Sequence, residues 1–225
     1  MTAKKKEYLD RFNKELNRIE KIKVPGRLLD IGCGYGFFLT VARDRGFETY
    51  GVDIDSREAE LCRMHLGLNV YCGVLSEGLY PEGYFDVITI FHTLEHVIDP
   101  NKIMAIFKKI LKPDGLLVIA VPHINDIRRF IYKGNWFYFR ADHLWYFSRQ
   151  TLKLLLSKHG FEIFKVRMAS GGSDIVKSLE MKTGIKTLGF INRNYFWLKF
   201  VKNFLSYILS LMGFNGNITV YARKK

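Results

Sequence analysis

Two acidic residues and a group of glycines follow short apolar runs early in the chain. Asp30 lies near the end of one apolar run, and Gly32, Cys33 and Gly34 come directly after it. Glycine lets the backbone turn sharply and lets a ligand approach without a β-carbon in the way. A second acid, Asp53, follows the next apolar run about 20 residues later, where a carboxylate can accept hydrogen bonds from two ribose hydroxyls. The pattern predicts a site for a nucleoside-containing ligand.

The spacing of the glycines and the charge beside them distinguish two classes of ligand. A dinucleotide fingerprint would need a third glycine at the position that Phe37 occupies. The carboxylate of Asp30 would repel a pyrophosphate, but it would attract the ammonium and sulfonium groups of S-adenosylmethionine. The pattern therefore favours S-adenosylmethionine as the cofactor. The alternative role for Asp53 is to cap a helix that begins near Ser56.

Histidines after a later apolar run are the candidates for acid–base chemistry. Methyl transfer to a weakly acidic hydroxyl needs alignment and a base. His92 is the first candidate base and His143 the second, although either ring could simply pack or bond a backbone carbonyl. His92, Glu95 and His96 would share one face if their segment were helical, as a divalent metal would require. The alternative is that they tie a turn to its helix, and we assign no metal ligand.

Short apolar runs alternate with amphipathic segments along most of the chain. The apolar runs suit strands covered on both faces, and the segments between them have helical periodicity. We predict an α/β fold with a doubly wound, mainly parallel sheet of Rossmann-like type, preceded by an N-terminal helix. The expected strands are 27–31, 48–52, 68–72, 86–91, 116–121, 161–168 and 218–222, and the expected helices are 36–45, 56–65, 101–111 and 148–160.

Further segments occur in the order found in one enzyme family. They are 85–88, 94–97 with 99–100, 111–115, and His143 with 146–148. Together with the glycine-rich turn they make the chain resemble the class I S-adenosylmethionine-dependent methyltransferases. The resemblance implies seven strands, with the last one antiparallel and beside the sixth. It also implies that the cofactor lies across the carboxyl ends of the first and fourth strands.

The same resemblance implies individual cofactor contacts. The glycine-rich turn would hold the methionine part, Asp53 the ribose, and Leu75 with Ser76 the edge of the adenine. The stretch 73–75 lacks the acid that often meets the adenine amino group. The full set of expected cofactor-binding residues is Asp30, Gly32, Cys33, Gly34, Asp53, Ile54, Leu75, Ser76 and Phe91.

Within this family the chain looks like the ubiquinone-pathway O-methyltransferases. Those enzymes carry an acid where this chain has His92, whereas Glu95 and His96 agree. The likeness implies methyl transfer to a small-molecule or lipid-linked acceptor, at oxygen. The alternatives are a nucleic-acid methyltransferase and a protein that binds S-adenosylmethionine without turnover. Enzymes that methylate base amino groups carry Asn or Asp, two prolines and an aromatic residue after the fourth strand. Residues 91–94 lack that pattern, so nucleic acid is not the expected partner.

An aromatic and basic stretch from 125 to 147 follows the fifth expected strand. Its segments 128–130 and 136–140 predict a pocket wall that suits an acidic ring or a phosphate-bearing acceptor. The alternative is a lid that packs on the core.

Composition and charge limit the remaining choices. The formal net charge of +13 favours anionic partners, and the three cysteines form no disulfide framework, so we expect a cytoplasmic protein. We expect one domain, with an N-terminal helix at 1–25, a cofactor-binding core at 26–168, a hydrophobic insertion at 169–217 and a last strand and tail at 218–225. The insertion predicts a helix that rests on an anionic membrane surface without crossing it, or else a lid or dimer contact. The oligomeric state stays open.

Overall fold

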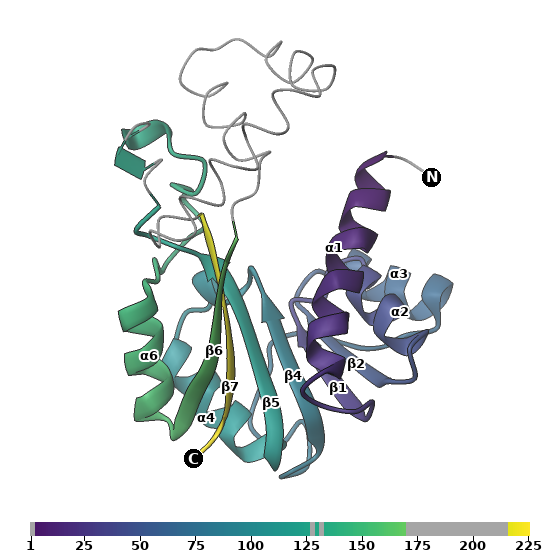
Figure 1. Cartoon of the computed structure of the whole chain (residues 1–225). Coiled ribbons are helices and arrows are strands. Elements are labelled where there is room, and N and C mark those ends of the chain that lie inside the picture. Colours follow the sequence, from purple (N-terminus) through teal and green to yellow (C-terminus); the bar gives the residue numbers. More distant parts are fainter. Residues whose placement is uncertain (1–2, 127–128, 131–132, 170–215) are drawn as a thin grey trace.

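The computed structural model describes residues 3–126, 129–130, 133–169 and 216–225. Within them a seven-stranded sheet has the order β3-β2-β1-β4-β5-β7-β6, and β7 runs antiparallel to both of its neighbours (Figure 1). The predicted fold class is therefore confirmed. The strands are β1 (Arg27–Ile31), β2 (Glu48–Asp53), β3 (Asn69–Cys72), β4 (Phe85–Phe91), β5 (Leu111–Pro122), β6 (Phe161–Ala169) and β7 (Asn217–Lys224).

Helices cover both faces of the sheet, as Figure 1 shows. One face packs against α1 (Ala3–Glu20), α2 (Phe37–Arg43) and α3 (Ser56–Leu66), through a core that includes Leu16, Phe38 and Cys62. The other face packs against α4 (Pro100–Ile110) and α6 (Arg149–Lys158), through Phe107 and Leu156 among others. Burial of these apolar side chains on both faces explains why the central strands are continuously apolar in sequence. Two short 3₁₀ helices, η1 (Leu94–His96) and η2 (Lys133–Asn135), lie in the connections.

Side-chain caps determine where three of the helices begin. The carboxylate of Asp55 accepts backbone N–H bonds at the start of α3, and Asp99 does the same for α4. Ser148 and Thr151 form a reciprocal capping box at the start of α6. Each cap satisfies backbone donors that the first helical turn leaves without a partner. The predicted helix 36–45 is shorter in the structure, because Gly36 has a left-handed φ of 69° and precedes α2.

The predicted strand 116–121 is longer in the structure. β5 begins at Leu111, because Leu111 already pairs with Phe85 before the register shifts toward Leu116. The predicted insertion 169–217 and its amphipathic helix fall almost wholly on residues 170–215, which lie outside the described residues. In the part of the chain that the structure describes, no helix combines the length and the apolar character needed to cross a membrane.

Gly32 brings the turn after β1 into close contact with the loop after β4. Its φ is 71°, and a β-carbon built there would lie 2.1 Å from Oγ1 of Thr93. Gly32 also donates a backbone hydrogen bond of 2.8 Å to the carbonyl of Val52 in β2. An L-residue at this position would meet both an unfavourable φ and a side chain with little room to move.

We predict that Gly32→Ala destabilises the protein far more than Gly67→Ala does. Gly67 has a φ of 60° with nothing within 4 Å of the added β-carbon, so its substitution costs only the left-handed conformation, about 1 to 2 kcal/mol. Gly32→Ala adds the clash with Thr93, roughly a further 1 to 3 kcal/mol. Urea unfolding of the two variants measures the difference. Equal losses would show that the loop after β4 moves away from Gly32 freely.

Candidate functional site

A hollow of about 520 Å³ opens above the carboxyl ends of β1 and β4. Five residues predicted to bind the cofactor or act as base line it together: Asp30, Gly32, Cys33, Phe91 and His92. Parallel strands deliver their following loops to one edge, and the strand order reverses between β1 and β4, which is where open α/β sheets bind ligands. The hollow therefore lies at the switch point of this sheet.

Asp30 is a buried acid at the floor of this hollow. Its side chain is 4% exposed, and its Oδ1 accepts a hydrogen bond of 2.6 Å from Oγ1 of Thr89. Burial raises the pKa of Asp30 to about 7, helped by the nearby charge of Asp53 and opposed by the Thr89 hydrogen bond. A cation placed against Asp30 would favour its charged form, so the group suits a positively charged ligand.

Asp53 joins the loop after β2 to the glycine-rich turn. Its Oδ2 accepts a hydrogen bond of 2.7 Å from the N–H of Gly34, and its Oδ1 accepts one of 2.9 Å from the N–H of Asp55. The cap of α3 is Asp55, so the alternative assignment of Asp53 as that cap is wrong. A carboxylate oxygen has more than one lone pair, so both oxygens of Asp53 can still accept ribose hydroxyls.

The remaining predicted cofactor contacts differ in their exposure. Ile54 is 76% exposed directly after β2, where the flat face of an adenine could cover it. Ser76 is exposed as well. Leu75 is 5% exposed and packs in the core, so an adenine at 75–76 would meet backbone and Ser76. Burial raises the pKa of the Cys33 thiol, which therefore stays protonated and serves as packing in the turn.

Helix α1 supplies a wall of the hollow that the sequence analysis did not assign. Tyr8, Arg11 and Phe12 line it, and the guanidinium of Arg11 lies over both rings, 5.3 Å and 5.2 Å from their centroids. In sequence the helix shows only an amphipathic pattern, which does not distinguish a wall of a site from a helix packed on the sheet.

A second hollow adjoins the first under α1. Arg11, Phe12, Phe91 and His92 line both, so the two spaces share one boundary. His92 has a φ of 53°, which is uncommon for a residue other than glycine, and its N–H bonds the carbonyl of Ala120 at 2.7 Å. This backbone conformation holds His92 at the junction of the two hollows.

A buried carboxylate lies beside His92. Nδ1 of His92 is 3.6 Å from Oε1 of Glu95, whose side chain is only 2% exposed. The other carboxylate oxygen, Oε2, is buried and has no hydrogen-bond partner in the described part of the chain. A buried carboxylate normally has polar partners, so Oε2 of Glu95 is positioned to accept a contact from a bound ligand.

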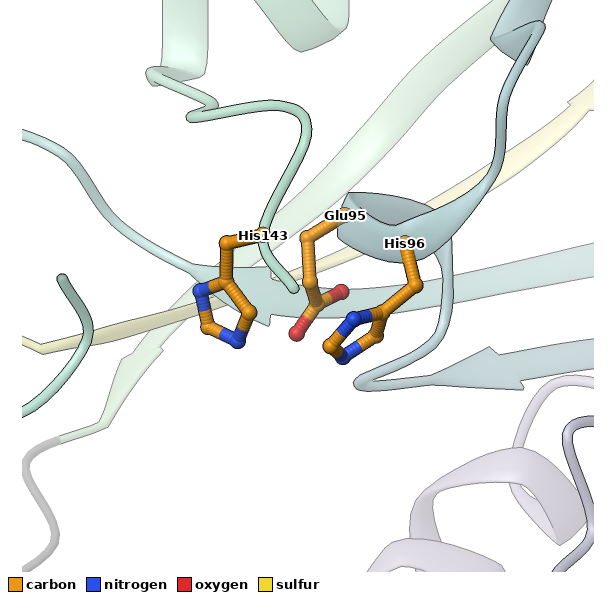
Figure 2. Close-up of side chains that lie close together, drawn as sticks. All are labelled: Glu95, His96 and His143. Carbon is orange, nitrogen blue, oxygen red and sulfur yellow. The ribbon is translucent and has the colours of Figure 1, made fainter. Parts of the chain in front are cut away.

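Two further histidines flank Glu95, as Figure 2 shows. The possible ligand atoms of Glu95, His96 and His143 all lie within 4.8 Å of one another. The condition for His92, Glu95 and His96 to share one helical face is not met, because only η1 is helical and His92 precedes it. His143 takes the third place, since the loop that carries it folds back onto Glu95, whose carbonyl accepts the N–H groups of Leu144 and Trp145.

This cluster fits a divalent cation by its donor set. One carboxylate and two imidazoles are ligands that zinc, manganese and iron share, and the unpartnered Oε2 of Glu95 is one of them. Burial lowers the pKa of His143, which keeps the ring neutral and able to donate a lone pair. Nδ1 of His96 lies 2.7 Å from the carbonyl of Asp142.

The aromatic stretch after β5 packs on itself rather than facing either hollow. Trp136 is 1% exposed, contacts Tyr138 and Tyr146, and donates its indole N–H to Asp126 over 3.0 Å. The predicted pocket wall is therefore not seen in its described part, where the stretch forms an aromatic cluster separate from the two core clusters of the sheet. The basic groups beside the second hollow come from α1 and β6 instead.

Comparisons with known proteins agree with this geometry. The family model described as "Methyltransferase domain" matches residues 4–166. The ubiquinone biosynthesis O-methyltransferase of Bordetella avium is 34% identical over 105 residues, which are 44% of each chain. The protein of the same name from Stutzerimonas stutzeri is 33% identical over 113 residues, 47% of this chain and 49% of that one. The chain thus spans less than half the length of the curated relatives it matches.

Solved structures resemble almost the whole chain. A SAM-dependent methyltransferase from Archaeoglobus fulgidus has a TM-score of 0.68 and 23% sequence identity, with 98% of this chain and 94% of that chain covered. At this identity the likeness shows the fold. The family match supplies the class of enzyme, a methyltransferase, and together with the S-adenosylmethionine-dependent neighbours it supports S-adenosylmethionine as the cofactor.

We predict that S-adenosylmethionine binds more tightly as the pH rises from 6 to 8. Below pH 7 the free protein holds a proton on Asp30, whose pKa is about 7, and a bound cation favours the carboxylate. Binding should then release a proton and weaken by up to about tenfold per pH unit below 7. Calorimetry in buffers with different heats of ionisation measures both quantities. Asp30→Asn should bind weakly at every pH, and a parent affinity that is the same at pH 6 and 8 would contradict the role of Asp30.

Proposed function

The chain belongs to the methyltransferase-domain family, and we propose that it transfers the methyl group of S-adenosylmethionine to an oxygen of a small or lipid-like acceptor. The observation that carries the proposal is the junction of the two hollows at Phe91 and His92. A cofactor over the glycine-rich turn and an acceptor under α1 would meet there. The names of the curated relatives support oxygen as the methyl acceptor, over the part of the chain that they match.

Three charged groups in or beside the first hollow would hold the cofactor. Asp30 would face the ammonium group, and the guanidinium of Arg11, which α1 brings to the same hollow, would face the carboxylate of the methionine part. Asp53 would accept the ribose hydroxyls while it holds Gly34. These contacts would point the activated methyl group toward the shared boundary, so that alignment supplies much of the rate.

His92 would act as the base at that boundary. The acceptor hydroxyl passes its proton to the imidazole while the new C–O bond forms and the C–S bond breaks, which leaves S-adenosylhomocysteine. Glu95, 3.6 Å from Nδ1, would orient the ring once a small movement completes the hydrogen bond. Phe12 and Phe91 would shield the reacting atoms from water.

The cluster of Glu95, His96 and His143 favours a second candidate mechanism. A divalent cation held by these three residues would supply Lewis acidity toward an acceptor oxygen. In that mechanism His92 would position the acceptor or the carboxylate of Glu95 rather than take the proton.

We predict that the protein forms a methyl ether from a phenolic acceptor, and that His92→Ala lowers kcat by about 100-fold without weakening cofactor binding. The assay follows deuterated methyl transfer to 3,4-dihydroxybenzoate and to a prenylated catechol by mass spectrometry. His65→Ala, at an exposed histidine of α3, is the matched control and should keep full activity. Transfer to nitrogen only, or to no phenol, would contradict the proposal.

The same assay separates the two mechanisms. If His92 is the base, EDTA leaves the rate unchanged and His143→Ala retains most activity. Loss of activity in EDTA with recovery on adding Mn²⁺, together with an inactive His143→Ala, would assign the chemistry to the cation site.

A further inference from the structure

The second hollow has a floor formed by neighbouring residues of four strands. Phe91 pairs with Ala120, Ala120 with Thr219, and Thr219 with Arg167, so one row crosses β4, β5, β7 and β6. Paired residues project on the same face of a sheet, and adjacent strands lie about 4.8 Å apart. The row therefore extends about 14 Å, from Phe91 beside the first hollow to Arg167, which carries a guanidinium group.

The side chains that line this hollow carry an excess of positive charge. Four cationic residues and one acid lie around it; they are Arg11, Lys14, Arg18, Arg167 and Glu15. Arg11 also lines the first hollow, where the proposed function pairs its guanidinium with the carboxylate of the cofactor. The other three cations exceed the single carboxylate, so the far end of the hollow is electropositive.

Glu15 holds two of these cations in place. It is 8% exposed, accepts a hydrogen bond from the hydroxyl of Tyr221, and lies 3.1 Å from Arg18 and 3.8 Å from Arg167. The two guanidinium groups come from α1 and β6 and meet at one carboxylate. Each guanidinium has five N–H donors, and one carboxylate cannot use them all. Both arginines line the hollow, so the N–H groups that Glu15 leaves unused are available to a carboxylate or phosphate bound there.

An unsatisfied amide lies at the same end. Oδ1 of Asn217 is buried and has no hydrogen-bond partner among the described residues. Asn217 starts β7 and lines the hollow together with Thr219, which is 5% exposed. A buried amide oxygen without a partner is costly, and an O–H or N–H donor on a bound ligand would satisfy it.

We propose that this hollow binds an acceptor that carries an oxyanion, a carboxylate or a phosphate, held between Arg18 and Arg167. The inference rests on the proposed function, because it places the methyl-accepting atom at the other end of the same ligand, beside His92. The apolar middle of the ligand lies over Ala120 and against Phe12. A neutral acceptor of the same shape binds more weakly, since it leaves the donors of both arginines without an acceptor.

Two fluorescent probes that differ in one anionic group test the proposal. 8-Anilinonaphthalene-1-sulfonate is an apolar anion, and N-phenyl-1-naphthylamine has the same ring system without the sulfonate. Both are titrated into the protein loaded with S-adenosylhomocysteine. We expect Arg167→Gln and Arg18→Gln to weaken binding of the anion about tenfold, as for one lost charge-assisted hydrogen bond, and to leave the neutral probe unchanged.

Controls separate a local effect from a global one. Arg223→Gln removes one positive charge from an exposed side chain near the far end of β7 and should not alter either probe. Arg167→Lys keeps the charge and should recover part of the affinity. Octanoate, octyl phosphate and octanol then compete with the anionic probe, and the stronger of the two anions identifies carboxylate or phosphate as the group.

Three results would overturn the inference: an anion affinity unaffected by both substitutions, equal losses for the two probes, or equal weakening by Arg223→Gln. Calorimetry with S-adenosylhomocysteine distinguishes this failure from failure of the proposed function. A protein that binds that nucleoside but shows no anion preference retains the methyltransferase assignment. One that does not bind it loses the proposed acceptor geometry, while the anion titration of the unloaded protein still tests the hollow.

Discussion

Three loops meet at one edge of the sheet, and their close contact determines the geometry of everything above it. Only glycine fits at position 32, because Thr93 occupies the space that a β-carbon would need. Gly34 donates its N–H to the carboxylate of Asp53. The first contact joins the loops after β1 and β4, and the second joins the loops after β1 and β2. A bulkier turn would separate these loops, and both the cofactor hollow and the position of His92 depend on their separation.

Electrostatics then divides this edge into two regions of opposite character. The first hollow is lined by the buried acid Asp30, and a second buried acid, Asp53, is bonded to the glycine-rich turn beside it; both suit the positive charges of S-adenosylmethionine. The second hollow, where we propose that the acceptor binds, is lined by four cationic residues, with Glu15 as its only acid among the described lining residues. Part of the net charge of +13 is therefore concentrated around the second hollow, and a positive field of this kind attracts anionic ligands.

Local patterns were enough to predict the strands and the residues at their carboxyl ends, and the family resemblance implied the antiparallel last strand. The period of the apolar runs, the glycines after β1 and the acid after β2 are each encoded within a few residues, so Asp30, Gly32 and His92 could be expected at one edge. The rest depends on contacts between distant segments. The wall formed by α1 arises from packing on the sheet, and its charged residues read in sequence as a solvated face.

The same limit explains why the sequence left the neighbours of Glu95 and the role of the aromatic stretch open. His143 lies beside Glu95 because the loop after β5 folds back onto η1, which no spacing in sequence records. The sequence predicts Trp136 in a pocket wall. In the structure its indole N–H donates a hydrogen bond to the buried carboxylate of Asp126, and its ring packs among other aromatic side chains. Large aromatic side chains are suited equally to pockets and to cores, so only the tertiary contacts decide between them.

The central claim is that the cofactor lies across β1 and β4 with its sulfur at the boundary of the two hollows. A crystal structure with S-adenosylhomocysteine tests it directly. The account predicts the ribose at Asp53, the amino group at Asp30, and the sulfur beside Phe91 and His92, facing the hollow under α1. A sulfur atom directed away from His92, or a nucleoside bound in the hollow under α1, would contradict it.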